Sequence, residues 1–358
     1  MKAAICTEFG LPLTLADVTL APPREGEIQV KLAACAICHS DIAYANGIWG
    51  GSLPAIYGHE AAGTVTALGQ GVSAFSNGDR VLVTLIRACG QCPACNGGQP
   101  TSCDHAWDAT PTPLSNAAGP IIRGMNTGAF AESCVVDASQ CVKLPNDIAF
   151  DVASLLACGV ITGIGAVVNT ARMKPGSNVA VIGAGGVGLN TIQGAAICGA
   201  ARIIALDINP EKLVAAKEFG ATDTMLSTTA DVPGKIRNLT QGRGVDYAFV
   251  TVGVPAVFQS TPDLLAAGGA MVMVGMTGTN DEVNYKPVNI ASMNQSLLGS
   301  RMGQTVLSRD IPWLIDLYRQ GRLKLDELIT KRWSLDQINE AMADTRAGHA
   351  RRNVIVFD

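Results

Sequence analysis

A glycine-rich turn between an apolar run and a helical pattern constrains the fold of this chain most strongly. Residues Asn178–Ile182 form a continuous apolar run, which is typical of a strand buried on both faces. The motif GAGGVG follows at 183–188, and Val187–Cys198 then has helical spacing. Gly183, Gly185 and Gly188 would permit a tight turn, close approach of a pyrophosphate and close helix–strand packing, and the positive helix end favours phosphates. The pattern predicts a dinucleotide-binding β–turn–α unit.

The alternation of strands and helices continues beyond this unit. Arg202–Ile208 reads as a strand, Asn209 as a helix cap, and Glu211–Phe219 as a helix that ends at a glycine. Further elements are expected at Val245–Val252 (strand), Ala256–Ala267 (helix), Ala270–Met276 (strand), Ser308–Gln320 and Leu335–Arg346 (amphipathic stretches) and Asn353–Phe357 (strand). Such alternation predicts an α/β fold with a doubly wound parallel sheet.

An acidic residue ends the second strand of this region. Asp207 lies 24 residues after Gly183, where a carboxylate can accept hydrogen bonds from both adenosine ribose hydroxyls. The same charge would repel a 2′-phosphate, so the sequence predicts NAD rather than NADP. The alternative is that Asp207 caps the helix that follows.

The first third of the chain has a different, β-rich pattern. Short alternating runs at Glu27–Leu32, Gly63–Ala67 and Arg80–Thr84 are separated by Gly, Pro and Asn/Asp turns. A chain of 358 residues is also too long for one small core. We therefore expect two domains, one β-rich and one doubly wound.

Four cysteines crowd into a short segment, Cys89-x2-Cys92-x2-Cys95-x7-Cys103. Thiolates at this spacing can complete a tetrahedron around Zn²⁺ and leave no open position, so the site would be structural. A redox cluster and a nucleic-acid-binding zinc ribbon are the alternatives. The glycines and proline between the cysteines disfavour the first, and the formal charge of −4 disfavours the second.

Composition excludes several classes of protein. Hydrophobic residues make up 48% and charged residues 16% of a chain without a basic run, which argues against disorder and against nucleic-acid or anionic-membrane partners. The start, MKAAICTEFG, lacks a signal-peptide pattern, so we expect a cytoplasmic protein with reduced cysteines. Glycines and polar residues interrupt the two long uncharged stretches, Val152–Ala171 and Ser177–Ala201, which disfavours membrane spans.

A third group of candidate ligands is dispersed along the chain. It comprises CHSD at 38–41, GHE at 58–60 and Cys158-Gly159. Cys38, His59 and Cys158 could supply three protein ligands and leave a fourth position open, as in catalytic zinc sites. No spacing rule joins them, and a lone buried cysteine is usually a core residue.

Taken together, these motifs resemble the zinc-dependent medium-chain alcohol dehydrogenase family over essentially the whole chain. CHSD, GHEAAG, the four-cysteine lobe, ACGVITG, the glycine turn and AGHARRNVIVF occur in the family's order. CGVITGIGAVVNTA at 158–171 and KEFGAT at 217–222 are most similar to the class III branch and its bacterial relatives. The resemblance implies a GroES-like catalytic domain at 1–158 and 303–358, and a Rossmann domain at 159–302.

The resemblance also implies roles for individual residues. Cys38, His59 and Cys158 would bind a catalytic zinc, with Glu60 close behind it and Asp41 orienting His59. Ser40 would accept the proton of the zinc-bound alcohol, and hydride would pass to the nicotinamide. The remaining cofactor contacts would come from His39 and Arg352 at the pyrophosphate, Thr162 at the nicotinamide, and Asp207 with Lys212 at the adenosine ribose.

Two departures from the family bear on mechanism and substrate. The histidine that often passes the proton to solvent is replaced by Ala43, and no arginine for a glutathione carboxylate lies between Cys103 and Arg123. We therefore expect NAD-linked oxidation of an alcohol. A glutathione-type S-(hydroxymethyl)thiol formaldehyde dehydrogenase, an aldehyde reductase working in reverse and a non-catalytic nucleotide-binding relative are the alternatives.

The family positions also suggest the substrate and the assembly. The expected pocket residues are large and mostly apolar, which favours an apolar or aromatic alcohol: Trp49, Leu85, Trp107 and Met276. The long stretch between Cys103 and Phe130 is similar to the dimeric branch of the family, so a homodimer is expected.

Overall fold

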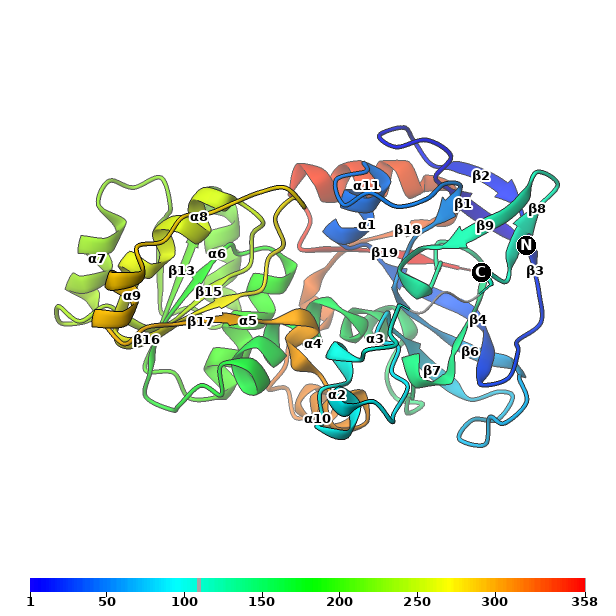
Figure 1. Cartoon of the computed structure of the whole chain (residues 1–358), viewed down its shortest axis with the longest axis horizontal. Helices are drawn as coiled ribbons and strands as arrows, with labels where there is room; N and C mark the ends of the chain where they lie inside the picture. The colour runs from blue at the N-terminus through cyan, green and yellow to red at the C-terminus, as the bar shows by residue number, and fades with distance from the viewer. Residues whose placement is uncertain (108–110, 358) are drawn as a thin grey trace. The chain divides into compact units, whose positions relative to one another are not determined.

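The computed structural model of the chain describes residues 1–107 and 111–357. These form two compact units, Met1–Cys158 with Val306–Asp358, and Gly159–Thr305. The sequence analysis expected the chain to return to the first domain at residue 303, and the first unit resumes at Val306, three residues later. Figure 1 follows the chain from the blue N-terminal strands through the green and yellow second unit to the red C-terminal elements.

The first unit is built on a mainly antiparallel sheet of order β11-β7-β6-β4-β19-β18. Its central strand β4 (Glu27–Ala36) pairs with β6 (Glu60–Leu68), β19 (Arg352–Val356) and, off this path, β10 (Ser133–Asp137). The remaining strands are β7 (Arg80–Val83), β11 (Cys141–Lys143) and β18 (Ile329–Ser334). The runs predicted at 27–32 and 63–67 lie inside β4 and β6, so the strands are longer than their alternating cores.

Smaller elements surround this sheet. The short strands are β1 (Lys2–Ile5) with β2 (Thr14–Asp17), and β3 (Thr19–Leu20), β8 (Leu114–Asn116), β9 (Gly119–Arg123) and β5 (Ala55–Ile56) in one four-stranded path. The helices are α1 (His39–Ala45), α2 (Pro93–Asn96), α3 (Phe150–Ser154), α10 (Leu307–Arg319) and α11 (Ile338–Ala347).

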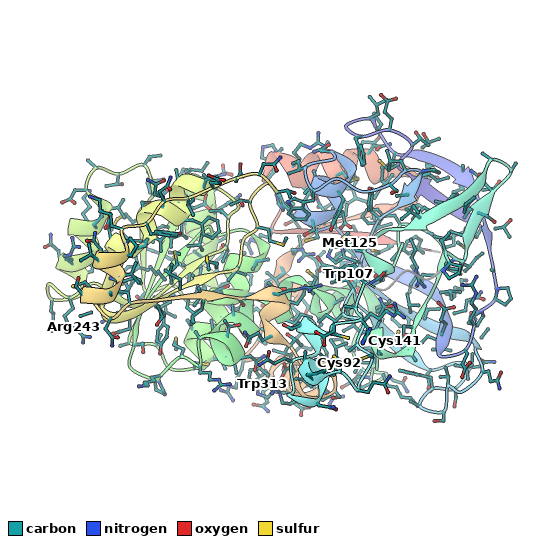
Figure 2. The ribbon with its side chains drawn as sticks, viewed as in Figure 1. Cys92, Trp107, Met125, Cys141, Arg243 and Trp313 are labelled. Carbon is teal, nitrogen blue, oxygen red and sulfur yellow. The ribbon has the colours of Figure 1, made fainter. Side chains whose placement is uncertain are left out.

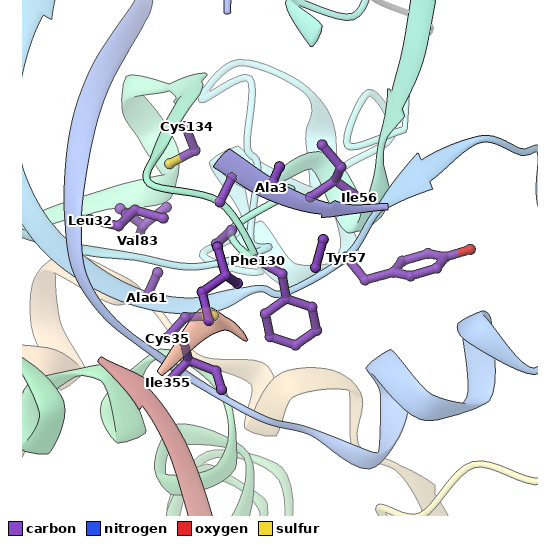
Figure 3. Packing of buried hydrophobic residues seen from close by; sticks show 14 of the residues in the cluster. Ala3, Leu32, Cys35, Ile56, Tyr57, Ala61, Val83, Phe130, Cys134 and Ile355 are labelled. Atoms are coloured by element: carbon purple, nitrogen blue, oxygen red, sulfur yellow. The ribbon is translucent and has the colours of Figure 1, made fainter. Parts of the chain in front are cut away.

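Apolar side chains from several of these elements form the core of the first unit. Phe130 and Ile56 are fully buried and Leu32 is 1% exposed. Figure 3 shows Phe130 among side chains of the surrounding strands, and Tyr57 at the edge with its ring directed away from them. Each fully buried large apolar side chain contributes about 1.5–3 kcal/mol relative to exposure. This packing positions the two segments that flank the candidate site, α1 and the start of β6.

The second unit is a six-stranded sheet of order β14-β13-β12-β15-β16-β17 in which every pair is parallel. Its strands are β12 (Asn178–Ile182), β13 (Arg202–Asp207), β14 (Asp223–Leu226), β15 (Val245–Val250), β16 (Leu265–Met273) and β17 (Ser296–Gly299). Its helices are α4 (Gly159–Gly165), α5 (Gly186–Ile197), α6 (Pro210–Glu218), α7 (Val232–Leu239), α8 (Pro255–Ser260) and α9 (Pro287–Ser292), and Figure 1 shows helices on both sides of the sheet. The predicted doubly wound parallel sheet is confirmed.

One predicted element in this unit is wrong. The helix expected over 256–267 ends at Ser260, a short 3-10 turn covers Thr261–Leu264, and β16 begins at Leu265. Pro262 has no N–H to continue an α-helix. Leu265 instead pairs with Val245 of β15. Short apolar runs do not distinguish a buried strand from a helix, so only the sheet contact decides.

The two uncharged stretches are divided into shorter elements. Residues 152–171 span α3, α4 and two short helical turns, and 177–201 span β12 and α5. Among the described residues no single helix is long and apolar enough to cross a membrane. The two helical segments on either side of Cys158 reach that length and composition only when they are counted together.

Candidate active site and metal centres

Helix α1 begins at the first cluster of candidate ligands. Its N-cap is Cys38, whose backbone is extended (φ −107°, ψ 152°). The Cys38 N–H donates to Asp41 Oδ2 at 3.0 Å. Asp41 is fully buried, so this carboxylate both closes the first helical turn and faces inward.

A glycine directs His59 towards α1. Gly58 has φ +88°, and a Cβ there would lie 2.7 Å from the backbone nitrogen of Phe130, so a larger residue would clash. The Gly58 N–H and His59 Nδ1 both lie within hydrogen-bond distance of Asp41 Oδ1, at 2.9 and 3.0 Å. Asp41 Oδ1 is thus placed where it can hold the imidazole in one orientation, the role that the family resemblance implies for this residue.

The dispersed candidate ligands meet at this point. The ligand atoms of Cys38, His59, Glu60 and Cys158 all lie within 4.8 Å of one another. With Nδ1 donating to Asp41 Oδ1, Nε2 of His59 can carry a lone pair, and this buried atom has no hydrogen-bond partner within the part of the chain that the structure describes. Buried polar atoms are rarely left unpaired. An unpaired imidazole nitrogen beside two sulfurs fits a zinc ion with three protein ligands and an open position.

A hydrogen bond between the two thiols shifts their pKa values in opposite directions. The Cys158 thiol donates to the Cys38 sulfur and holds the pKa of Cys38 well below its usual value, although burial acts in the opposite direction. The same hydrogen bond, together with burial, raises the pKa of Cys158. Of the two, Cys38 is therefore the thiol whose surroundings favour the thiolate.

A buried ion pair lies behind these ligands. Arg352 Nη2 is 2.6 Å from Glu60 Oε1, with side chains 6% and 0% exposed. Burial raises the pKa of Glu60 to about 7, and the charge of Arg352 opposes this shift. The sequence analysis expected Arg352 at the pyrophosphate and did not predict this ion pair. The contact depends on the register of β19 beside β4, which no local motif indicates.

The four-cysteine lobe is the second candidate metal centre. The Sγ atoms of Cys89, Cys92, Cys95 and Cys103 lie within 4.8 Å of one another around the short helix α2, and Figure 2 labels Cys92. Backbone N–H groups point at the sulfurs, for example from Cys89 to Cys103 Sγ at 3.3 Å and from Cys92 to Cys89 Sγ at 3.3 Å. Hydrogen bonds from the Asp104 and Cys95 backbones lower the pKa of Cys92 to about 6. Four sulfurs with N–H donors fit a closed structural zinc site.

The glycine turn at the end of β12 has the geometry that a pyrophosphate requires. Gly183 has φ +97°, and a Cβ on Gly188 would lie 1.8 Å from the carbonyl oxygen of Gly183. A Cβ on Gly185, by contrast, would meet no protein atom within 4 Å. Gly183 and Gly188 are therefore required by the backbone of the turn. Gly185 is not, and the open space beside it at the helix N-terminus is where a phosphate could approach.

Asp207 is tied directly to this turn. Its Oδ2 accepts from the Ala184 N–H at 2.7 Å, and its Oδ1 accepts from the Asn209 N–H at 2.9 Å. The N-cap of α6 is Asn209, whose side chain accepts from Glu211 N–H at 2.8 Å. Asn209 is therefore the N-cap of α6, and Asp207 binds the backbone N–H of that residue just before the helix.

The neighbours of Asp207 complete this edge of the sheet. Lys212 is half-buried in the first turns of α6. Ile208, the residue directly after Asp207, is 75% exposed.

The other predicted residues lie at separate places. Ser40 is half-buried and His39 exposed in the first turn of α1, while Thr162 is 8% exposed in α4 and donates to Met302 Sδ at 3.8 Å. Trp49 and Leu85 are half-buried. Trp107, labelled in Figure 2, is 51% exposed, and Met276 of the second unit is 65% exposed.

Comparison with known proteins identifies the family. A model of the alcohol dehydrogenase GroES-like domain matches residues 24–146, and a model of zinc-binding dehydrogenases matches residues 186–320. The chain belongs to the zinc-dependent medium-chain alcohol dehydrogenases. Both the predicted family and the predicted fold class, a GroES-like domain with a Rossmann domain, are confirmed.

Three similar proteins illustrate the family. Alcohol dehydrogenase class-3 of Oryza sativa subsp. japonica is 34% identical over 374 residues, covering 100% of this chain and 97% of the relative. Benzyl alcohol dehydrogenase of Acinetobacter calcoaceticus has a TM-score of 0.93 at 29% identity, covering 100% and 99% of the two chains. A zinc-binding dehydrogenase of Sinorhizobium meliloti 1021 bound to NADP has a TM-score of 0.84 at 26% identity, covering 99% of each.

Membership of the family establishes the class of reaction. This zinc-dependent alcohol dehydrogenase is an oxidoreductase for small-molecule alcohols, and it uses zinc and a nicotinamide dinucleotide.

Proposed function

We propose that this alcohol dehydrogenase prefers NAD, oxidises apolar or aromatic alcohols, and uses Cys38, His59 and Cys158 as the ligands of its catalytic zinc. The observation that carries the proposal is the buried, unpaired Nε2 of His59 beside the two thiols. We assign the catalytic domain to 1–158 and 303–358, and the cofactor domain to 159–302.

The residues of the first unit prepare the alcohol for oxidation. Bound zinc supplies a Lewis acid that lowers the pKa of the alcohol hydroxyl. Asp41 holds His59 in the tautomer with a free Nε2. Ser40, two residues after Cys38, accepts the hydroxyl proton, and with Ala43 in place of a histidine it passes that proton to water.

The residues of the second unit hold the cofactor, which supplies the hydride acceptor. Asp207 keeps free lone pairs on both oxygens beyond its bonds to Ala184 and Asn209, and these can accept the ribose hydroxyls. Its charge disfavours a 2′-phosphate, and the NADP-bound relative makes this preference worth direct measurement. The other proposed contacts in the second unit are Thr162, Gly183, Gly185, Gly188 and Lys212, whereas His39 and Arg352 of the first unit stay predictions from the family resemblance.

The proposed substrate is an alcohol with a bulky apolar or aromatic group. The support is the large side chains at the pocket positions, Trp49, Leu85, Trp107 and Met276, together with the similarity to a benzyl alcohol dehydrogenase. We further propose a cytoplasmic homodimer that has no membrane or nucleic-acid partner.

A thiol-adduct formaldehyde dehydrogenase is the second candidate, since one relative is a class-3 enzyme. The first arginine after the zinc lobe is Arg123. Its Nη1 lies 3.3 Å from Glu27 Oε1, and both side chains are largely buried, so it is already committed to an internal ion pair. This disfavours recognition of a glutathione carboxylate by Arg123.

A substrate panel tests the proposal. Benzyl alcohol, cyclohexylmethanol, ethanol and S-(hydroxymethyl)glutathione would each be supplied with NAD and with NADP, and NADH or NADPH formation followed by absorbance. We expect the highest kcat/KM with benzyl alcohol and NAD. Highest activity with the thiol adduct would support the second candidate, whereas zinc and NADH binding without turnover would indicate a non-catalytic relative.

A further inference from the structure

We propose that Tyr44 is a positioning residue for substrate recognition, which holds the indole of Trp49 in one orientation. The consequence is selectivity for alcohols whose carbinol carbon carries an aromatic ring over saturated alcohols of the same size. The inference rests on the proposed function, in which Trp49 lines the substrate site.

Three aromatic rings form a continuous stack in the first unit. The Tyr44 and Trp49 ring centroids are 5.2 Å apart with an interplanar angle of 81°, which is an edge-to-face contact. On its other side Tyr44 stacks on Tyr57, with centroids 6.0 Å apart and an angle of 22°. Both geometries are ones that aromatic pairs prefer. Tyr44 is therefore the middle ring and limits how Trp49 can turn.

The innermost ring of the stack is anchored in the core. Tyr57 is 3% exposed, and its hydroxyl donates to the Tyr44 carbonyl oxygen at 3.5 Å. Burial raises the pKa of Tyr57 to about 12, so the hydroxyl stays protonated and remains a donor. Figure 3 shows the Tyr57 ring extending away from the edge of the packed cluster.

The stack is joined to the segments that carry the chemistry. Tyr44 follows Ser40 by four residues on α1, so the two side chains share a face of the helix. Tyr57 directly precedes Gly58 and His59. The chain then folds back after α1 through the hydrogen bond from Ile48 N–H to Ala43 O at 3.0 Å, which brings Trp49 beside the helix.

A held indole affects aromatic and saturated substrates differently. Trp49 is only half-buried, so part of its ring surface remains accessible. An aromatic substrate gains a directional ring contact with a fixed indole, whereas a saturated ring gains only apolar contact. Loss of the Tyr44 ring would remove the edge-to-face contact that orients the indole, which weakens binding of an aromatic substrate without changing the reacting groups.

The test compares benzyl alcohol with cyclohexylmethanol, which differ in aromaticity but little in size. We expect Tyr44→Leu to raise KM for benzyl alcohol about three- to tenfold, to leave KM for cyclohexylmethanol unchanged, and to keep kcat within about twofold. Tyr44→Phe retains the ring and should behave as wild type. In a Trp49→Leu background Tyr44→Leu should have no further effect on the ratio, because Tyr44 acts through Trp49.

Zinc content and NADH affinity provide the folding control, and Tyr44→Met is a second variant without a ring if Tyr44→Leu loses zinc. An equal rise in KM for both alcohols, or additive effects in the Trp49→Leu background, would overturn the inference. A wild-type preference for benzyl alcohol that survives Tyr44→Leu contradicts only the role of Tyr44. A wild type without that preference contradicts the proposed substrate class as well.

Discussion

At the scale of a single residue, the carboxylate of Asp207 contacts the protein backbone and, in the proposed function, the cofactor. It binds the backbone of the glycine turn and of α6, and its oxygens still have lone pairs for a ribose. Loss of this carboxylate should lower kcat/KM with NAD, because a hydrogen-bond acceptor for the ribose is removed. It should raise kcat/KM with NADP, because a charge that repels the 2′-phosphate is removed.

We expect Asp207→Ser to lower the ratio of kcat/KM with NAD to that with NADP by about 10–100-fold, because a hydrogen bond to a charged group contributes about 1.5–3 kcal/mol. Asp207→Asn is the matched control: it keeps an oxygen acceptor while removing the charge, so its ratio should be intermediate. Steady-state kinetics with both cofactors measures this. A wild-type preference for NADP would contradict the assignment of Asp207.

Ser40 and Ala43 together define the second prediction at this scale. Ser40→Ala should lower the rate of hydride transfer by about 10²-fold, since the alcohol proton then lacks its first acceptor. Ala43→His should raise the rate near neutral pH and have little effect at alkaline pH, where hydroxide accepts the proton. Pre-steady-state NADH formation across pH is the measurement. Near-normal single turnover by Ser40→Ala would remove Ser40 from the mechanism.

At the scale of elements, the glycine turn separates stability from ligand binding. Gly188→Ala would place a methyl group 1.8 Å from the Gly183 carbonyl oxygen, whereas the methyl group of Gly185→Ala would meet no protein atom. We expect the first variant to lower the melting temperature of the cofactor-free protein. The second should leave it unchanged but weaken NADH binding. Thermal melts and NADH fluorescence titrations separate the two, and equal stability of both variants would contradict this account.

The two zinc-binding elements should also respond differently to the loss of a ligand. Cys95→Ser should abolish the lobe zinc and lower the melting temperature, because a closed site contributes folding energy directly. Cys158→Ser should abolish activity but leave a folded protein that binds NADH. Zinc analysis should give two ions per chain in the wild type and one in each variant. One zinc per wild-type chain would be inconsistent with the assignment of two sites.

At the scale of the whole molecule, the expectation concerns assembly. The chain has a mass of 37.1 kDa, and the proposed homodimer rests on the length of the segment between Cys103 and Phe130. Sedimentation equilibrium over a dilution series should give twice the chain mass. Four times that mass, or the mass of one chain, would contradict the predicted dimer.

The sequence by itself determined the features that depend on short-range patterns. The glycine turn, the parallel strand that precedes it and the four-cysteine lobe lie within short segments, and β12 has the predicted bounds, Asn178–Ile182. Such features are readable because the period of apolar residues and the reach of neighbouring side chains are set by local backbone geometry.

Only the tertiary structure decided which distant residues meet. No local rule joins Cys38, His59 and Cys158, and the family resemblance alone suggested their common site before the structure brought them within reach of one another. The Glu60–Arg352 pair spans 292 positions and was not predicted at all. Strand order and register place these side chains together, and both depend on packing of the whole sheet, which no short segment of sequence encodes.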